Sequence, residues 1–207
     1  MENMTFMDII KINPLIIGTL LICSVFMFGY LLERIWAFLN VGRVDAALAE
    51  RVKQFVRNGQ IKEAIALCTK NRDFFSSSME VALNASSLPR EEMENIFALY
   101  HSKLQGLLGK HLALFGTLAF IGPLIGLLGT VLGVIRAFRD LALSGSGGPT
   151  IVAAGIAEAL ITTAGGIGVA VVAAVFYNIF TAVARSRVQQ FDQLCQEIAI
   201  LIYTGKR

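Results

Sequence analysis

The sequence predicts an all-α membrane protein with three transmembrane helices, and its composition and the placement of its charges carry this prediction. Of the 207 residues, 55% are hydrophobic and 16% are charged, whereas soluble domains average about 25% charged residues. The mean hydropathy is +0.65. The hydrophobic residues gather in three runs. Each run is close to or longer than the about 20 residues that a helix needs to cross a bilayer. Nearly all charged residues lie between these runs or beyond them.

The first run predicts a transmembrane helix over residues 14–38. Pro14 to Leu32 contains no charged residue, and an aromatic and charged group follows it, as at a lipid headgroup boundary. Many Lys and Arg residues follow the run, while Lys11 alone precedes it. Because basic residues tend to stay in the cytoplasm, we expect the N-terminal segment 1–13 outside and the stretch after the helix inside.

Residues 39–111 are polar and predict a cytoplasmic helical region. Apolar residues at helical spacing indicate a helical hairpin that turns at Asn58-Gly59, and a third short helix is predicted from Phe74 to Ala85. From Arg90 no helix breaker occurs before Pro123, so one helix is predicted to start in the cytoplasm and continue straight into the membrane. The hairpin spacing is set by Leu48, Val52, Phe55 and Val56 before the turn and by Ile61, Ala64, Ile65 and Cys68 after it.

The second run predicts a transmembrane helix over residues 112–138, which passes outward if the first passes inward. Arg136 and Arg139 lie at its far, outer end and are therefore exceptions to the rule that basic residues stay on the cytoplasmic side. We accept them because the opposite topology would place most Lys and Arg outside. Residues 139–150 contain several Gly and Ser residues together with Pro149 and predict a short outer loop, too small for a catalytic domain.

The third run predicts a transmembrane helix over residues 151–184 that returns to the cytoplasm. Apolar residues keep helical spacing through residues 185–207, which predicts a cytoplasmic C-terminal helix. A continuous helix from Ile151 to Tyr203 would be about 80 Å long. That is far more than a bilayer requires, so the amphipathic half needs a helical partner in the cytoplasm.

Glu158 is the one Asp, Glu, Lys or Arg between Ile151 and Ala184. A charge at mid-bilayer costs about 2.5 to 3.5 kcal/mol on insertion scales, so Glu158 is a candidate functional residue that needs a partner. Thr162 lies one turn away and about 40° round the helix, whereas Thr163 lies about 140° away and faces a different surface. Thr130 lies near the same depth in the second span. Each threonine alone also has a structural explanation, because a helical hydroxyl often bonds its own i−4 carbonyl.

Small residues are spaced along the second and third spans in a way that lets helix backbones approach closely. One interpretation is ordinary helix packing within one chain. The other is a polar pathway between copies of the chain, because three spans are few for enclosing a pore. The positions concerned are Gly122, Pro123, Gly126, Gly129 and Gly133 in the second span and Gly155, Gly165 and Gly166 in the third.

Enzymatic chemistry finds little support in the sequence. No nucleophile-base pair, Gly-rich phosphate loop or nucleic-acid module is present, so we expect no enzyme, no cofactor and no nucleic-acid partner. The three cysteines are far apart without CxxC spacing, and His101 and His111 have no carboxylate or cysteine at ligand spacing, so we expect no metal site.

Two long motifs give the sequence a specific resemblance. AFIGPLIGLLGTVLGVIRAF (Ala119 to Phe138) and GIAEALITTAGGIGVAVVAAVFYNIF (Gly155 to Phe180) resemble the two signature spans of the MotA/TolQ/ExbB proton-channel family, in its ExbB/TolQ branch. The resemblance covers nearly the whole chain, including the order of spans and the large cytoplasmic segment between the first two.

The resemblance implies a subunit of a bacterial inner-membrane stator, with a periplasmic N-terminus and a cytoplasmic C-terminus. Family members form homo-pentamers whose second and third helices line a central pore, into which two copies of a single-span ExbD/TolR-type partner insert. That partner carries the essential aspartate. The matching polar positions in this sequence are Glu158, Thr130 and Thr163, while Pro123 and Asn178 also match without a chemical role beyond kink and packing.

The function that the resemblance implies is use of the proton motive force to energise a TonB-like or TolA-like protein. TonB-linked import of nutrients or biopolymers across the outer membrane and Tol-linked maintenance of the cell envelope both remain open, as do the coupling ion and the cargo. A third hypothesis, from a different class, is a passive membrane scaffold in which Glu158 only makes an interhelical hydrogen bond.

Overall fold

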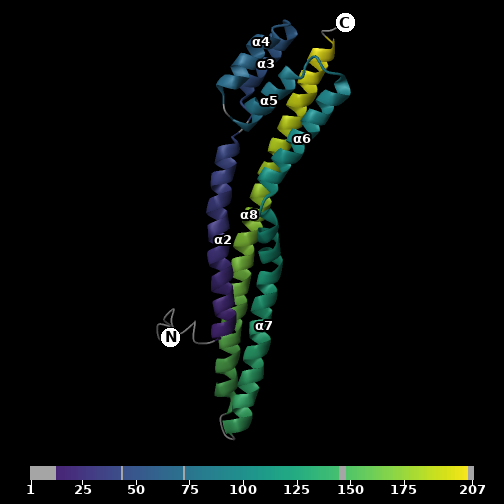
Figure 1. The fold of residues 1–207 in the computed structure, drawn as a ribbon. Coiled ribbons are helices and arrows are strands. Elements are labelled where there is room, and N and C mark those ends of the chain that lie inside the picture. The colour runs from purple at the N-terminus through teal and green to yellow at the C-terminus, as the bar shows by residue number, and fades with distance from the viewer. Residues whose placement is uncertain (1–12, 43, 72, 145–147, 205–207) are drawn as a thin grey trace. The chain divides into compact units, whose positions relative to one another are not determined.

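The computed structural model describes residues 13–42, 44–71, 73–144 and 148–204, and every regular element among them is a helix. The prediction of an all-α chain is therefore confirmed. Two compact units share the chain (Figure 1): the span unit, Met1–Leu32 with His111–Ile179, and the polar unit, Glu33–Lys110 with Phe180–Arg207. The helices are α2 (Pro14–Val41), α3 (Ala46–Arg57), α4 (Ile61–Lys70), α5 (Phe74–Asn84), α6 (Arg90–Gly109), α7 (Leu112–Ser144) and α8 (Gly148–Thr204).

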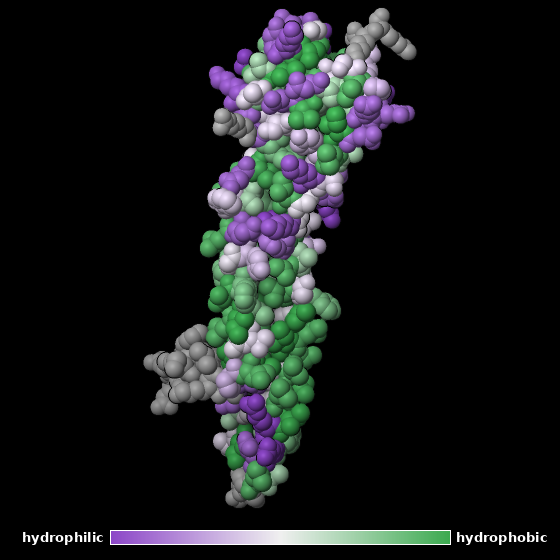
Figure 2. Space-filling view, viewed as in Figure 1, coloured by the Kyte–Doolittle hydropathy of each residue, from purple (hydrophilic) through white to green (hydrophobic). Residues whose placement is uncertain are grey.

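Within the residues that the structure describes, three helical stretches are long and apolar enough to cross a membrane, as predicted. They are Pro14–Arg57, which contains α2 and the short α3, Leu112–Leu143 within α7, and Pro149–Thr204 within α8. Large apolar side chains such as Phe26, Phe120 and Val171 are exposed on them, and Figure 2 shows mostly hydrophobic side chains on the visible face of the span unit. Exposed apolar surface of this extent is typical of helices that face lipid or another chain.

The predicted continuous helix from Arg90 into the second span is wrong. α6 ends at Gly109, where the Lys110 N–H donates to the Gly106 carbonyl oxygen at 3.1 Å, and α7 starts at Leu112. Between them His111 has a φ of 61°, a left-handed conformation that histidine adopts more readily than most non-glycine residues. Its ring lies 4.9 Å from the ring of Tyr30. The helix therefore breaks without a proline.

The predicted outer loop, residues 139–150, is also shorter than expected. α7 continues to Ser144, and α8 already begins at Gly148. Pro149 lies in the first turn of α8, where the missing N–H of proline would have had no helical partner. The Gly, Ser and Pro residues that predict a loop are therefore compatible with helix ends. α8 runs unbroken from Gly148 to Thr204, which confirms the long continuous helix.

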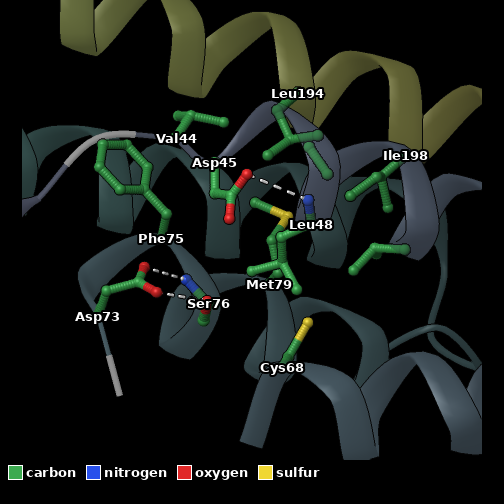
Figure 3. Close-up of a pocket in the computed structure, with 12 residues that line it drawn as sticks. Val44, Asp45, Leu48, Cys68, Asp73, Phe75, Ser76, Met79, Leu194 and Ile198 are labelled. Carbon is green, nitrogen blue, oxygen red and sulfur yellow. Dashed lines mark hydrogen bonds between the residues drawn. The ribbon is translucent and has the colours of Figure 1, made fainter. Parts of the chain in front are cut away.

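The polar unit contains the predicted hairpin and third helix. α3 and α4 meet at Gly59, whose φ of 73° favours glycine. Asp45 caps α3 by accepting from the Ala47 N–H at 2.9 Å, and Asp73 caps α5 by accepting from the Ser76 N–H at 2.8 Å. Side chains from these helices and from α8 surround a small cavity of about 20 Å³ (Figure 3), which is a packing gap in the core. Its apolar lining includes Cys68, Phe75, Met79, Leu194 and Ile198.

Two buried arginines each bind the end of another helix in the polar unit. Arg34, only 1% exposed, donates from Nη1 to the Leu107 carbonyl oxygen at 3.1 Å in the last turn of α6, and pairs with Glu33. Arg187 donates from Nη1 to the Phe38 carbonyl oxygen at 2.5 Å in the last turn of α2. A cation at these C-terminal carbonyls satisfies unpaired acceptors and complements the helix dipole. The sequence pattern alone does not predict either contact.

Replacement of Arg34 is therefore expected to destabilise the polar unit. Arg34→Gln removes a charged hydrogen bond to a buried carbonyl, worth about 1.5 to 3 kcal/mol. The melting temperature of the detergent-solubilised chain should fall by several degrees. Arg51→Gln is the matched control, because Arg51 is exposed on α3 and loses the same charge. Equal shifts for the two variants would contradict the helix-end role of Arg34.

The buried thiol of Cys68 makes the stability of the polar unit depend on pH in the alkaline range. Its side chain is 1% exposed, and burial raises its pKa from 9.0 to about 11. Because the folded pKa is raised, the buried neutral thiol contributes stability fully below pH 9.0, and this contribution is lost as pH rises toward about 11. We expect alkylation of Cys68 at pH 8 to be far slower in the folded chain than in denaturant, as followed by peptide mass spectrometry. Equal rates would contradict the burial of this thiol.

Candidate functional site

α7 and α8 touch through their backbones along a line of small residues. A Cβ added to Gly166 would lie 2.5 Å from the Gly122 carbonyl oxygen, and one added to Gly126 would lie 2.9 Å from Cα of Thr163. One added to Gly133 would lie 2.7 Å from Cβ of Ala159. Such distances exclude any side chain, so glycine is required for this approach.

The other glycines predicted to lie at helix contacts do not all face the same neighbour. Added carbons at Gly129 and Gly155 would clash with Thr162 and Ala137, respectively, so both positions belong to the α7–α8 contact. Gly165 does not, because its added Cβ would meet only Leu20 of α2, at an ordinary 3.6 Å. Pro123 lies inside α7 and leaves one helical carbonyl without its usual N–H donor.

Three threonines gather at the centre of this contact. The Oγ1 atoms of Thr130 and Thr163 lie 2.5 Å apart, one from each helix, and both hydroxyls also lie within hydrogen-bond distance of the Gly126 carbonyl oxygen, at 3.2 and 3.0 Å. We call Thr130 and Thr163 the threonine pair. Thr162 is 1% exposed and donates to the Ala159 carbonyl oxygen at 2.7 Å. The helix wheel correctly separates Thr163 from Glu158, and the structure shows that Thr163 faces α7.

Glu158 is exposed on α8 in the single chain and lines a cavity of about 280 Å³. Thr162, the neighbour expected from the helix wheel, lines the same cavity. An exposed carboxylate on a membrane helix is costly against lipid, so the Glu158 side of α8 requires water or another chain. The polar residues that share this cavity with Glu158 and Thr162 are Asn13, Arg136 and Asp140.

Sequence reasoning missed these three polar neighbours of Glu158. From the sequence, Arg136 indicates only the membrane topology, and Asp140 is placed in the outer loop. Their i, i+4 spacing nevertheless places both residues on one face of α7. The stripe Gly129, Gly133, Ala137 and Asp140 has the spacing that could have indicated a shared face. Asn13 offers no such signal, because its position depends on how the start of α2 packs.

The fold and the site together define a class: a helical membrane protein with three candidate spans among the residues that the structure describes, a tight glycine-lined pair of long helices, and an exposed acidic side chain on the second of these helices. The sequence model of the MotA/TolQ/ExbB proton channel family matches residues 67–193. The chain belongs to this family, as its two signature spans indicate.

Curated relatives and a solved structure agree with this assignment. The chain is 29% identical over 164 residues to the biopolymer transport protein ExbB of Pseudomonas putida, covering 74% of this chain and 50% of that protein. It is 35% identical over 96 residues to ExbB of Xanthomonas campestris pv. campestris, covering 46% and 38%. The chain thus spans half or less of the length of these relatives. The structure of C. jejuni MotAB matches with a TM-score of 0.63 and 19% identity, covering 92% of this chain and 70% of that one, which shows a shared fold.

Proposed function

We propose that the chain is a proton-channel stator subunit of the bacterial inner membrane that uses the proton motive force together with a single-span ExbD/TolR-type partner. The observation that carries the proposal is Glu158, an exposed carboxylate on α8 that lines a cavity together with Gly129 and Gly133 of the glycine-lined contact. One proton crossing 100 mV releases about 2.3 kcal/mol, which is comparable to the insertion cost of a charge. Proton binding at one carboxylate is therefore enough to bias a helix interface.

Several copies of the chain would surround the partner. Three spans in one chain are few for a pore, and large apolar side chains remain exposed on α7 and α8, including Leu127, Val131 and Val175. We propose a homo-pentamer in which α7 and α8 line the central pore, with Glu158, Thr130 and Thr163 on the ion route. The ligand class is the proton, because a carboxylate and hydroxyls can exchange protons without the coordination shell that a larger cation needs.

The orientation follows from the distribution of basic residues. The N-terminus and the α7–α8 connection are proposed to lie in the periplasm, and α3 to α6 with the C-terminal end of α8 in the cytoplasm. The polar unit would then present its charged surface to the cytoplasm. Energy from the proton motive force is proposed to pass to a TonB-like protein for import across the outer membrane, with a TolA-like recipient as the second candidate.

The threonine pair gives a separable prediction. Thr163→Val keeps side-chain shape and removes one hydroxyl, so the complex should stay assembled with a stability loss of at most about 1.5 kcal/mol. Partner-dependent proton flux should fall about tenfold, because a barrier increase of about 1.4 kcal/mol has that effect. Thr117→Val is the control on α7, where the hydroxyl donates to its own helix at Ala113 at 2.9 Å. Equal flux in the two variants would remove the threonine pair from the ion route.

The proposed function is tested by deletion of the gene in its own host. Loss of energy-dependent uptake across the outer membrane, with a single-span protein that carries a membrane aspartate co-purifying with the chain, is the expected result. Sensitivity to detergents with normal uptake would indicate the Tol-type alternative. A deletion strain with neither defect, from whose complemented form no single-span protein co-purifies, would contradict the stator proposal and favour the passive scaffold.

A further inference from the structure

Asn13 carries a buried polar atom that has no hydrogen-bond partner among the residues that the structure describes. It is the N-cap of α2, and its carbonyl oxygen accepts from the Ile17 N–H at 2.9 Å. An N-cap asparagine ordinarily also accepts a backbone N–H with its side-chain oxygen. Here Oδ1 lacks such a partner within the described residues, although Asn13 is only 3% exposed. A buried amide oxygen of this kind needs a donor such as water to compensate for its lost hydration.

The same side chain lines the cavity at Glu158. That cavity of about 280 Å³ is bordered by α7, by α8 and by the residue that precedes α2, with Arg136 and Asp140 on α7, Glu158 on α8 and Asn13 directly before α2. A water molecule needs roughly 10 to 15 Å³ of such space and two to four polar partners. The cavity offers room for several waters, and its polar groups come from α7, from α8 and from the residue before α2. An apolar cavity would stay dry, but this one has the lining of a hydrated one.

The charges of the lining favour a cation. Asp140 and Glu158 are acidic and Arg136 is basic, so the formal charge of the side chains that line the cavity is negative in sum. Thr162 adds a hydroxyl whose proton is already donated to Ala159, leaving its oxygen lone pairs for water. Water chains between such groups can carry a proton without a bound metal or cofactor.

We propose that this cavity is a water-filled vestibule inside a single subunit, through which hydrated protons reach Glu158, with Asn13 and Asp140 as its polar lining residues. The inference rests on the proposed function and adds a route to it. A hydronium ion in the vestibule gives its proton to the Glu158 carboxylate. One O–H bond of the hydronium breaks, one O–H bond to the carboxylate forms, and a neutral water remains. Access through the space between subunits is the competing route.

Proton flux separates the two routes. The chain is reconstituted with its single-span partner in liposomes, and voltage-driven, partner-dependent flux is followed with a pH-sensitive dye. Asn13→Leu keeps the branched side-chain shape and removes the amide oxygen that has no partner among the described residues, and Ala154→Leu fills the cavity from α8. Each should lower flux about tenfold, the equivalent of about 1.4 kcal/mol in the barrier. Asn13→Ser, which keeps a polar group, should lower flux less than Asn13→Leu does, and Thr19→Val, which removes a hydroxyl bonded to Leu15 within α2, should leave flux unchanged.

Chemical labelling supplies a readout that does not depend on transport. A water-soluble carbodiimide with a hydrophilic amine should modify Glu158 in the assembled complex, as quantified by peptide mass spectrometry. Asn13→Leu and Ala154→Leu should lower that modification about tenfold, in parallel with flux. If Ala154→Leu fails to assemble, the Asn13→Leu and Asn13→Ser pair decides alone. Modification of unaltered Glu158 by a lipid-soluble carbodiimide only would show a dry site and overturn the vestibule.

The vestibule and the proposed function fail in different ways. Unchanged flux and labelling in Asn13→Leu and Ala154→Leu, with flux abolished in Glu158→Gln, would overturn the vestibule, place entry between subunits and leave the stator function standing. Full partner-dependent flux in Glu158→Gln would overturn the proposed function and the vestibule with it.

Discussion

A Gly166→Ala chain is expected to lose the close approach of α7 and α8. The added Cβ would lie 2.5 Å from the Gly122 carbonyl oxygen and 2.9 Å from Cα of Gly126, and both are backbone atoms that cannot rotate away. Overpacking of this kind costs about 1 to 3 kcal/mol even where side chains can adjust, and here the helices themselves must separate. The same separation would pull Thr163 away from Thr130. We therefore expect a large drop in melting temperature and loss of the assembled complex.

The matched control lies on the same helix. An added Cβ at Gly168 meets nothing within 4 Å in the single chain, and alanine is about 1 kcal/mol better than glycine inside a helix. Gly168→Ala should therefore melt at the same or a higher temperature than the unaltered chain. Thermal unfolding in detergent and size-exclusion chromatography measure both variants. If Gly166→Ala assembles and melts as Gly168→Ala does, the glycine-lined contact does not hold the span unit together.

A Glu158→Gln chain is expected to assemble normally and to lose function in the cell. Glutamine has nearly the same shape and keeps a carbonyl acceptor, but it cannot take up and release a proton in the physiological range. Removal of a proton-transferring group typically costs about 100-fold or more. Complementation of a deletion strain should therefore fall to the level of the empty vector. Glu158→Asp, which keeps the proton chemistry on a shorter side chain, should retain part of the activity.

The control for charge is Glu63→Gln, at an exposed position of α4 in the polar unit. It removes one carboxylate from the chain and should complement fully. Co-purification of the partner and size-exclusion chromatography show whether each complex is intact. Full activity of Glu158→Gln and Glu158→Ala in intact complexes would favour the passive scaffold, in which this carboxylate only makes an interhelical hydrogen bond.

The helices could be predicted where hydrophobic periodicity and composition alone determine them, without contacts from distant residues. The apolar runs predict the three spans, and the hairpin at Gly59 has both an apolar stripe and a helix stop. The break at His111 was not predictable in this way, because a left-handed histidine is stable only in its surroundings, here beside Tyr30. Pro149 misled for the opposite reason, since proline ends a helix in its interior but fits the first turn.

Site residues could be predicted where their type or spacing differs clearly from the rest of the segment that contains them. Glu158 stands out as the one charge in an apolar run, and the glycines stand out by spacing. The threonine pair required either the family resemblance or the structure, because Thr130 and Thr163 meet across two helices at 2.5 Å. The role of Asn13 in the cavity lining could not be predicted from the sequence, because a polar residue directly before a helix is ordinarily a helix cap. Only the packing of α2 shows that its amide is buried.

Proton flux through the reconstituted complex tests the central claim most directly. Liposomes containing the chain and its single-span partner are given a membrane potential, and internal pH is followed with and without the partner. Flux that requires the partner and disappears in an intact Glu158→Gln complex is the predicted result. Flux of equal size in the unaltered and Glu158→Gln complexes, or none in either, would contradict the assignment of this carboxylate to proton transfer.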